Sequence, residues 1–312
     1  MHPGIWFDSD CVYYTISGLF GSIVNYTDLT SAKKIVSAPD FMLNVAEDRN
    51  GTLDRDIQAY GDFVYIWYET SSKCNELYCY SIAQKTYEKK YSSNHIINDW
   101  AILNDMLVYS TFSDTYGGIS TANLWCCNLN DGTNLLIAEG TTAFGIVNNQ
   151  IRYVMPTSER EALFSFDLKT SQSNLLCEFE GIYGSYNQYN FTSNHLTFLD
   201  ERTDDTMSHS SQYSTLCTID ITTGKKTSYT LPETLEYMVC YDQYGFLCNQ
   251  NKVYRINLSD GTTALVCDQL TECNGLYAIS EDQVAAVDYK NWGQPKLYFI
   301  SSDGTMSKSI SV

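Results

Sequence analysis

Residues able to carry out catalysis stand in no common catalytic motif in this chain of 312 residues. No two of the four histidines stand at the spacing of metal ligands. The chain also lacks a Gly-x-Ser-x-Gly nucleophile elbow and a Gly-x4-Gly-Lys phosphate loop. The sequence therefore predicts no catalytic residue, no metal site and no cofactor, and it favours a protein that is not an enzyme.

Asp56 and Asp99 keep one enzymatic alternative open. Each carboxylate begins a repeated unit described below, so the two could lie close together in the folded chain. Paired carboxylates carry out glycoside hydrolysis when their separation is suitable. The alternative function is therefore a polysaccharide hydrolase or lyase with its site in a central channel.

Aromatic and arginine side chains near glycines suit ligand binding better than catalysis. Tyrosine and tryptophan present flat amphipathic surfaces at low entropic cost, and arginine offers forked hydrogen-bond donors. An equally good interpretation is that the aromatic residues pack between adjacent loops. The candidates on these segments are Tyr116, Arg160, Tyr183, Tyr186, Arg202 and Trp292.

The segment 200–214 holds Asp200, Glu201, Asp204, Asp205 and His209. Such a carboxylate cluster could bind Ca²⁺, but it lacks the Asp-x-Asp-x-Asp-Gly spacing of a calcium loop. We interpret it as a solvated hairpin tip.

The element that would position these residues is a β-hairpin, seen most clearly in 252–267, KVYRINLSDGTTALVC. Two apolar-alternating runs flank an Asp-Gly turn, which is a strong hairpin signal. Seven related hairpins occur, and in each a short polar residue closes the first run and can bond to the turn backbone. These turn residues are Asp28, Ser81, Asn128, Asp167, Asp220, Asn257 and Ser301.

A second hairpin precedes each of these, and large apolar residues flank its turn with a period of two, as in a half-buried strand. Successive turn starts are 52, 43, 44, 45, 49 and 39 residues apart. Four strands in each such interval match the blade period of a propeller. The turns begin at Ser9, Gly61, Asn104, Asn148, Ser193, Asp242 and Glu281.

The repeats predict an all-β chain, a single seven-bladed β-propeller of four-stranded antiparallel blades over 1–312. The loops between blades and between second and third strands would share one face, the top face, where a ligand would bind. The segment 37–55 would be a lid over the channel or a short helical cover. The expected blades are 3–37, 56–93, 98–138, 142–180, 187–231, 236–267 and 275–312. Polar candidates at the channel mouth are Arg55, Asp56, Asp99 and Glu236.

Units such as Phe164–Thr170 and Cys217–Gly224 resemble the Leu-Tyr-x-x-Asp-Leu-x-Thr-Gly hairpin of TolB-like and YWTD-like propellers. The chain is most similar to an uncharacterised bacterial family of Tyr-rich propellers related to the low-density-lipoprotein-receptor propeller. Its blades lack the Tyr-Trp-Thr-Asp run, the Gly-His and Trp-Asp pairs of WD40 repeats, and the Asp boxes of sialidases. The resemblance implies a non-catalytic binding module for a peptide, glycan or protein partner.

The net charge of −18 argues against nucleic-acid binding and against adsorption to anionic membranes. No apolar run approaches the roughly 20 residues of a membrane span, so we expect no membrane insertion. No signal peptide is recognised in the sequence. The location is therefore left open between the cytoplasm and, if the chain is an excised domain, the exterior.

The 11 cysteines have no regular spacing, and several fall within predicted strands. We expect most to be free, buried thiols in a reducing compartment, which favours the cytoplasm. In an exported protein, the alternative pairs would be Cys74–Cys79 and Cys267–Cys273.

Overall fold

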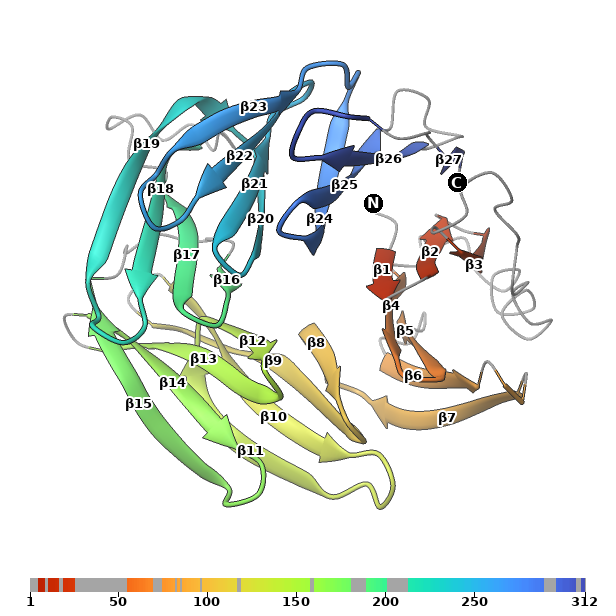
Figure 1. Cartoon of the computed structure of the whole chain (residues 1–312). Coiled ribbons are helices and arrows are strands. Elements are labelled where there is room, and N and C mark those ends of the chain that lie inside the picture. The colour runs from red at the N-terminus through yellow and green to blue at the C-terminus, as the bar shows by residue number, and fades with distance from the viewer. Residues whose placement is uncertain are drawn as a thin grey trace. The chain divides into compact units, whose positions relative to one another are not determined.

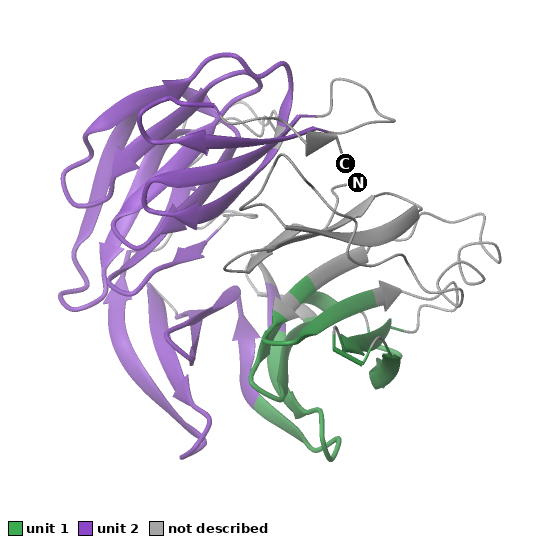
Figure 2. Ribbon diagram, turned by 45° about the vertical axis from the view of Figure 1, so that its right-hand side comes forward, with its two compact units in different colours: residues 1–112, 123–136, 312 green, residues 113–122, 137–311 purple. Residues whose placement is uncertain are grey.

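The computed structural model describes residues 5–8, 11–16, 19–25, 55–69, 75–81, 83–84, 86–95, 97–116, 119–157, 160–180, 189–200, 213–288, 296–306 and 310–311. The regular secondary structure in these ranges consists of β-strands, and the strands pair antiparallel within short sheets (Figure 1). The chain forms two compact units (Figure 2): unit 1 holds residues 1–112, 123–136 and 312, and unit 2 holds residues 113–122 and 137–311.

Unit 1 contains a three-stranded sheet and a four-stranded sheet, and it shares a second four-stranded sheet with unit 2. The three-stranded sheet comprises β1 (Ile5–Asp8), β2 (Cys11–Ile16) and β3 (Leu19–Asn25). The next comprises β4 (Arg55–Tyr60), β5 (Phe63–Glu69), β6 (Asn75–Ser81) and β7 (Thr86–Ser93). The shared sheet comprises β8 (Ile97–Leu103), β9 (Met106–Tyr116), β10 (Ile119–Asn128) and β11 (Asn134–Thr141).

Unit 2 contains four further sheets of four strands each, and in every sheet the strands follow one another in chain order. The first comprises β12 (Ala143–Val147), β13 (Gln150–Pro156), β14 (Glu161–Asp167) and β15 (Gln172–Phe179). The second comprises β16 (Asn190–Phe191), β17 (His195–Asp200), β18 (Tyr213–Asp220) and β19 (Lys226–Leu235). The third comprises β20 (Tyr237–Tyr241), β21 (Tyr244–Cys248), β22 (Val253–Asn257) and β23 (Thr263–Cys267). The fourth comprises β24 (Cys273–Ser280), β25 (Gln283–Asp288), β26 (Lys296–Ser301) and β27 (Ile310–Ser311).

The prediction of seven four-stranded blades is wrong. The described residues form six complete four-stranded blades, and the N-terminal sheet has only three strands. The expected fourth strand of that sheet would follow Asp28, and residues 26–54 lie outside the described residues. The expected cover or lid, 37–55, lies outside the described residues except for Arg55. The single domain over 1–312 stays a prediction.

The first turn of each complete blade lies where the spacing predicted it. Asn104, Asn148 and Asp242 adopt the left-handed conformation, with φ values of 55°, 51° and 48°. Asparagine and aspartate tolerate this region better than other residues that have a Cβ, so they suit tight hairpin turns. The predicted second turns are also confirmed where the side chain bonds to the turn backbone, at Ser81, Asn128, Asp167, Asp220 and Asn257.

The apolar residues that flank these turns form the core. Leu107, Ile151 and Leu196 are completely buried. Burying each of these side chains contributes about 1.5–3 kcal/mol. At the corresponding position of the next blade stands Gly245, where an added Cβ would lie 3.1 Å from the side chain of Ile256. In this blade the side chain of Ile256 therefore fills the space that an apolar side chain of the second strand fills in the other blades.

Hairpin turns also pack against the preceding sheet in unit 2. Three glycines with positive φ lie against the last strand of the preceding sheet: Gly224 near Glu178, Gly261 near Tyr229 and Gly304 near Val266. At Gly261 an added Cβ would lie 2.1 Å from the Tyr229 ring, so no larger residue fits without movement. The repeated turn thus also sets how neighbouring sheets pack.

Candidate functional site

The candidate site lies at the edge of unit 2 where the first strand of each sheet begins, which we call the upper edge. The first strands β12, β16, β20 and β24 are in contact in chain order and enter their sheets from this edge. Because the strands alternate in direction, the ends of second and fourth strands and the starts of third strands lie there too. Polar side chains gather at this edge in two clusters.

The first cluster joins Glu161, at the start of β14, to Tyr189, just before β16. The Tyr189 hydroxyl lies 3.0 Å from Oε1 and 2.9 Å from Oε2 of Glu161, and it donates its proton to the carboxylate. Glu161 is 6% exposed and forms no ion pair with the described residues. The pair connects two successive sheets and leaves a buried carboxyl without a cationic partner in direct contact.

Aromatic rings surround this pair. Tyr189 packs on Phe198 with ring centroids 5.5 Å apart, and Phe179 packs on Phe198 at 6.4 Å. The ammonium group of Lys226 lies 5.5 Å from the centroid of the Phe198 ring. The same ammonium group donates to the backbone oxygen of Glu180 at 3.4 Å. Lys226 therefore interacts with an aromatic face and a carbonyl while it lies close enough to Glu161 to influence its charge.

Burial raises the pKa of Glu161 from 4.5 to about 7. The hydrogen bond from Tyr189 and the charge of Lys226 lower this pKa, but the loss of water outweighs both. Glu161 therefore titrates near neutral pH. A cation bound next to it would favour the ionised form and release a proton.

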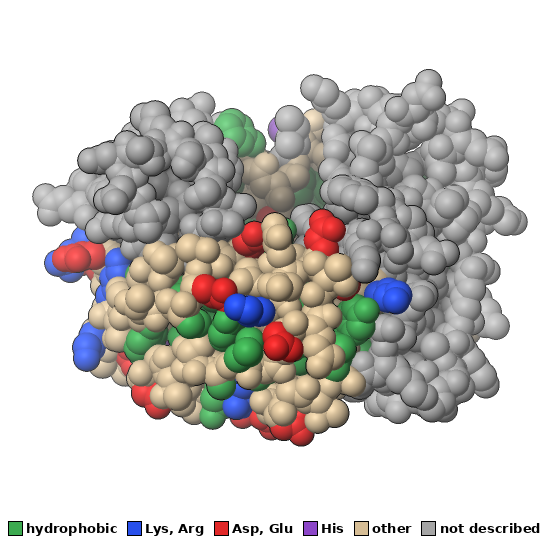
Figure 3. Space-filling model, turned by 90° about the horizontal axis from the view of Figure 1, so that it is seen from above, with side chains coloured by type: hydrophobic (Ala, Val, Ile, Leu, Met, Phe, Trp, Pro, Cys, Tyr) green, Lys and Arg blue, Asp and Glu red, His purple; other side chains and the backbone are tan. Residues whose placement is uncertain are grey.

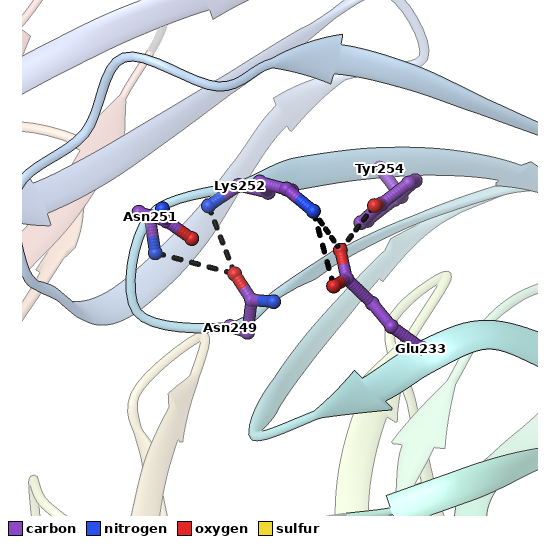
Figure 4. Close-up of polar contacts among 5 residues, drawn as sticks. All are labelled: Glu233, Asn249, Asn251, Lys252 and Tyr254. Carbon is purple, nitrogen blue, oxygen red and sulfur yellow. Dashed lines mark hydrogen bonds and ion pairs between the residues drawn. The ribbon is translucent and has the colours of Figure 1, made fainter.

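The second cluster joins Glu233, near the end of β19, to Lys252 and Tyr254 of the following sheet (Figure 4). The Lys252 Nζ lies 3.1 Å from both carboxylate oxygens of Glu233, and the Tyr254 hydroxyl donates to Oε1. The turn before Lys252 is fixed by Asn249, whose Oδ1 accepts the backbone N–H groups of Asn251 at 3.2 Å and Lys252 at 2.9 Å.

The electrostatics of the second cluster are opposite to those of the first. The hydrogen bond from Tyr254, followed by that from Lys252, lowers the pKa of Glu233. The same ion pair raises the pKa of Lys252. Glu233 is therefore ionised and neutralised at physiological pH, and it does not require a ligand for charge balance.

The structure places the sequence-predicted residues unevenly. Arg160 is exposed and directly precedes Glu161, and Glu236 precedes β20 at the upper edge, with its N–H bonded to Cys248 O at 2.8 Å. Tyr116 is the last residue of β9, and its side chain is not among those described. The remaining aromatic and arginine candidates, Tyr183, Tyr186, Arg202 and Trp292, lie outside the described residues.

The structure places the expected acid pair on adjacent strands of unit 1. β4 and β8 are in contact, and Gln58 Oε1 accepts the N–H of Ile102 at 2.5 Å. Arg55 and Asp56 open β4, and Asp99 lies in β8 with its Oδ1 bonded to the N–H of Trp100 at 2.9 Å. The side chains of Arg55 and Asp56 are not described, so their role as a polar group or acid pair stays a prediction.

Sequence reasoning missed Glu161, Glu233 and Lys252 as candidates. A signal for Glu161 was present, because a lone glutamate opens the otherwise apolar run Glu161-Ala162-Leu163-Phe164. Tyr189 is half-buried and packs against the core cluster of its sheet while its hydroxyl donates to Glu161.

The side chains of the described surface are mixed in character. Figure 3 shows acidic, basic and hydrophobic side chains interspersed on one face. No group of three or more potential metal ligands occurs among the described residues. The part of the chain that was described also contains no helix long and apolar enough to cross a membrane.

The sequence matches no protein-family model and no curated protein. Solved structures are nevertheless similar in fold. The β-propeller domain of the Trilobed protease from Pyrococcus furiosus is 9% identical, with 98% of this chain and 95% of that chain covered and a TM-score of 0.62. The Neurospora crassa Pan2 WD40 domain is 8% identical, with 96% and 88% covered and a TM-score of 0.58.

The tricorn protease is 10% identical with a TM-score of 0.59, and this chain spans only 35% of its length. A TolB structure from Acinetobacter baumannii is 13% identical, with 99% of this chain and 79% of that chain covered and a TM-score of 0.49. The likenesses show that the chain is an all-β β-propeller. They include a WD40 domain and propellers of proteases, and they show no specific relation to YWTD propellers.

Proposed function

We propose that this propeller is a non-catalytic module that binds a basic peptide or a basic segment of a partner protein at its upper edge. The observation that carries the proposal is Glu161, a buried carboxyl at this edge without an ion-pair partner among the described residues. A lysine, arginine or amino terminus of a partner would supply the missing charge and gain a charge-assisted hydrogen bond.

The overall charge supports the same class of partner. A net charge of −18 attracts cationic molecules over long distances and raises their rate of association. Arg160, exposed beside Glu161, can bond to a carbonyl or carboxylate of the same partner, because arginine offers forked donors. The WD40 domain among the similar structures supports a binding module only at the level of the fold.

The first experiment measures the binding of peptide libraries of basic, neutral and acidic composition to the whole chain. We expect basic peptides to bind, with an affinity that falls as salt rises. Calorimetry of the best peptide in two buffers of different ionisation enthalpy should show proton release at pH 7, because Glu161 titrates near that pH.

Two variants separate the role of Glu161 from general electrostatics. Glu161→Gln should lose both the affinity and the proton release. Glu233→Gln removes the same charge from a carboxylate that is already ionised, so proton release should persist. Equal binding of acidic peptides, or full affinity in Glu161→Gln, would contradict the proposal.

The enzymatic alternative is tested separately. A panel of polysaccharides is incubated with the wild-type chain and with Asp56→Asn and Asp99→Asn. We expect no turnover by any of them. Turnover by the wild type that either substitution abolishes would assign an enzyme instead.

A further inference from the structure

Two cysteine thiols of unit 2 face each other between neighbouring sheets. Cys248 ends β21 and Cys273 begins β24, and their sulfur atoms lie 3.2 Å apart. Both side chains are buried, with exposed fractions of 0% and 2%. The backbone holds them in place, because the N–H of Cys273 donates to the carbonyl of Gln250 at 2.6 Å, two residues after Cys248.

We propose that Cys248 and Cys273 are a redox pair that forms a disulfide and links these two sheets covalently. A disulfide needs sulfur atoms about 2.05 Å apart, so each sulfur has to move by less than about 1 Å. The surrounding cluster is apolar and includes Phe246, Val266 and Ile300. The Cys273 sulfur also lies 3.6 Å from the carbonyl oxygen of Gly275.

The other cysteine in this cluster is engaged elsewhere. Cys267 is buried, and its sulfur contacts the Met306 sulfur at 3.8 Å. Cys267 and Cys273 are both free thiols, as is Cys79 in the sheet of β4–β7. The geometry therefore favours Cys248 over Cys267 as the partner of Cys273, in contrast to the pairing that sequence proximity suggested.

The chemistry is a thiol–disulfide exchange with a small disulfide oxidant such as glutathione disulfide. One protein thiol loses its proton and attacks the oxidant, which releases one glutathione thiolate and leaves a mixed disulfide. The second protein thiol loses its proton and attacks the mixed disulfide, which releases the second glutathione. Two protein thiols are oxidised to one disulfide, and one glutathione disulfide is reduced to two glutathiones.

Burial, together with the neighbouring Cys273, raises the pKa of Cys248 well above the usual thiol range. The thiolate is the reactive form, so the folded chain reacts slowly at neutral pH. Oxidation should therefore be fastest during folding or local opening, and once formed the link should resist reduction in the folded state.

The test compares the whole chain refolded in reduced glutathione with the chain refolded in a mixture of reduced and oxidised glutathione. Each product is denatured without reductant and alkylated. We expect two fewer reactive thiols after oxidative refolding and a linked pair of tryptic peptides containing Cys248 and Cys273. The oxidised form should unfold at a temperature roughly 5 °C higher.

Three variants make the assignment specific. Cys248→Ala and Cys273→Ala should each remove the linked peptides and the thermal difference. Cys267 lies in the same cluster and the same tryptic peptide as Cys273. Cys267→Ala should therefore retain the linked peptides and the thermal difference. Unchanged thiol numbers in the wild type, or a link that joins Cys273 to Cys267, would overturn the proposal.

Discussion

Two glutamate–tyrosine pairs at the upper edge of unit 2 share a design but differ in charge state. Each pair joins a carboxylate of one sheet to a tyrosine hydroxyl of the next sheet: Glu161 with Tyr189, and Glu233 with Tyr254. Glu161 is 6% exposed, whereas the Glu233 side chain is 29% exposed and adjoins Lys252. Burial raises the pKa of Glu161, whereas the hydrogen bond from Tyr254, followed by that from Lys252, lowers the pKa of Glu233.

This difference separates a structural contact from a candidate binding site. The Glu233 cluster is complete, because its ion pair and hydrogen bonds balance the carboxylate charge within the chain. The Glu161 pair is incomplete, because the ionised form of Glu161 is a buried charge without an ion-pair partner among the described residues. A chain can maintain such a carboxyl only if the surrounding packing tolerates its cost.

The largest expected effect is on the packing that buries Glu161. Phe198 is completely buried and contacts the rings of both Tyr189 and Phe179. We expect Phe198→Ala to lower the free energy of unfolding by about 3–5 kcal/mol, measured by urea denaturation. Leu265→Ala, at a position 51% exposed, serves as the control and should change stability by less than about 0.5 kcal/mol. A loss under about 1 kcal/mol for Phe198→Ala would contradict this packing.

The second expected effect is a dependence of stability on pH. The pKa of Glu161 is about 7 in the folded chain and 4.5 as its ordinary value, so the folded state binds an extra proton between these values. The contribution of Glu161 to the free energy of unfolding is fully present below pH 4.5. It falls by on the order of 3 kcal/mol as the pH rises to about 7.

Glu161→Gln is neutral at every pH and keeps the shape of the side chain. Unfolding curves between pH 4 and pH 9 should therefore show this loss in the wild type and not in the variant. A similar decline in both proteins would mean that another group titrates, and that Glu161 is not the buried acid that the geometry indicates.

The third expected effect compares the two tyrosine hydroxyls directly. Tyr189→Phe removes the donor to both oxygens of Glu161, so stability at pH 8 should fall by about 1–3 kcal/mol because an ionised carboxylate is left buried. The pKa of Glu161 should rise further, because that hydrogen bond lowers it.

Tyr254→Phe is the matched substitution in the second pair. Lys252 still bonds to Glu233 in this variant, so the loss should be smaller, about 0.5–1 kcal/mol. If Tyr189→Phe and Tyr254→Phe lower the free energy of unfolding equally at pH 8, the burial of Glu161 does not distinguish the two glutamate–tyrosine pairs.

The contrast between the pairs also shows how far sequence can predict this molecule. Turn residues such as Asn104 and Asp220 act locally, so their roles and the blade period followed from residue types and spacing. The number of strands in each sheet could not be predicted in the same way, because the spacing of turns sets where a unit begins and not how many of its strands pair.

The candidate site depends on contacts between sheets, and spacing does not report these. Glu161 and Tyr189 are 28 residues apart, and nothing in either local sequence indicates that their side chains meet. Arg160 was selected for its residue type, although its buried neighbour Glu161 is the residue with the raised pKa. The Cys248–Cys273 contact was missed for the same reason, since nearer cysteines in the sequence were better candidates by proximity.

The smallest expected effect concerns the ion pair of the second cluster. Glu233→Gln removes the charge that bonds to Lys252, and a partly exposed pair contributes less than about 1 kcal/mol. The pKa of Glu233 is lowered in the folded chain, so its contribution is present above pH 4.5 and is lost as pH falls through the folded pKa. The sign is therefore opposite to that of Glu161. Unfolding curves at pH 7 should show a small difference between wild type and variant that shrinks as the pH falls through the folded pKa and also shrinks in roughly 1 M salt. A difference that grows as the pH falls would show that Glu233, like Glu161, is held as a neutral acid.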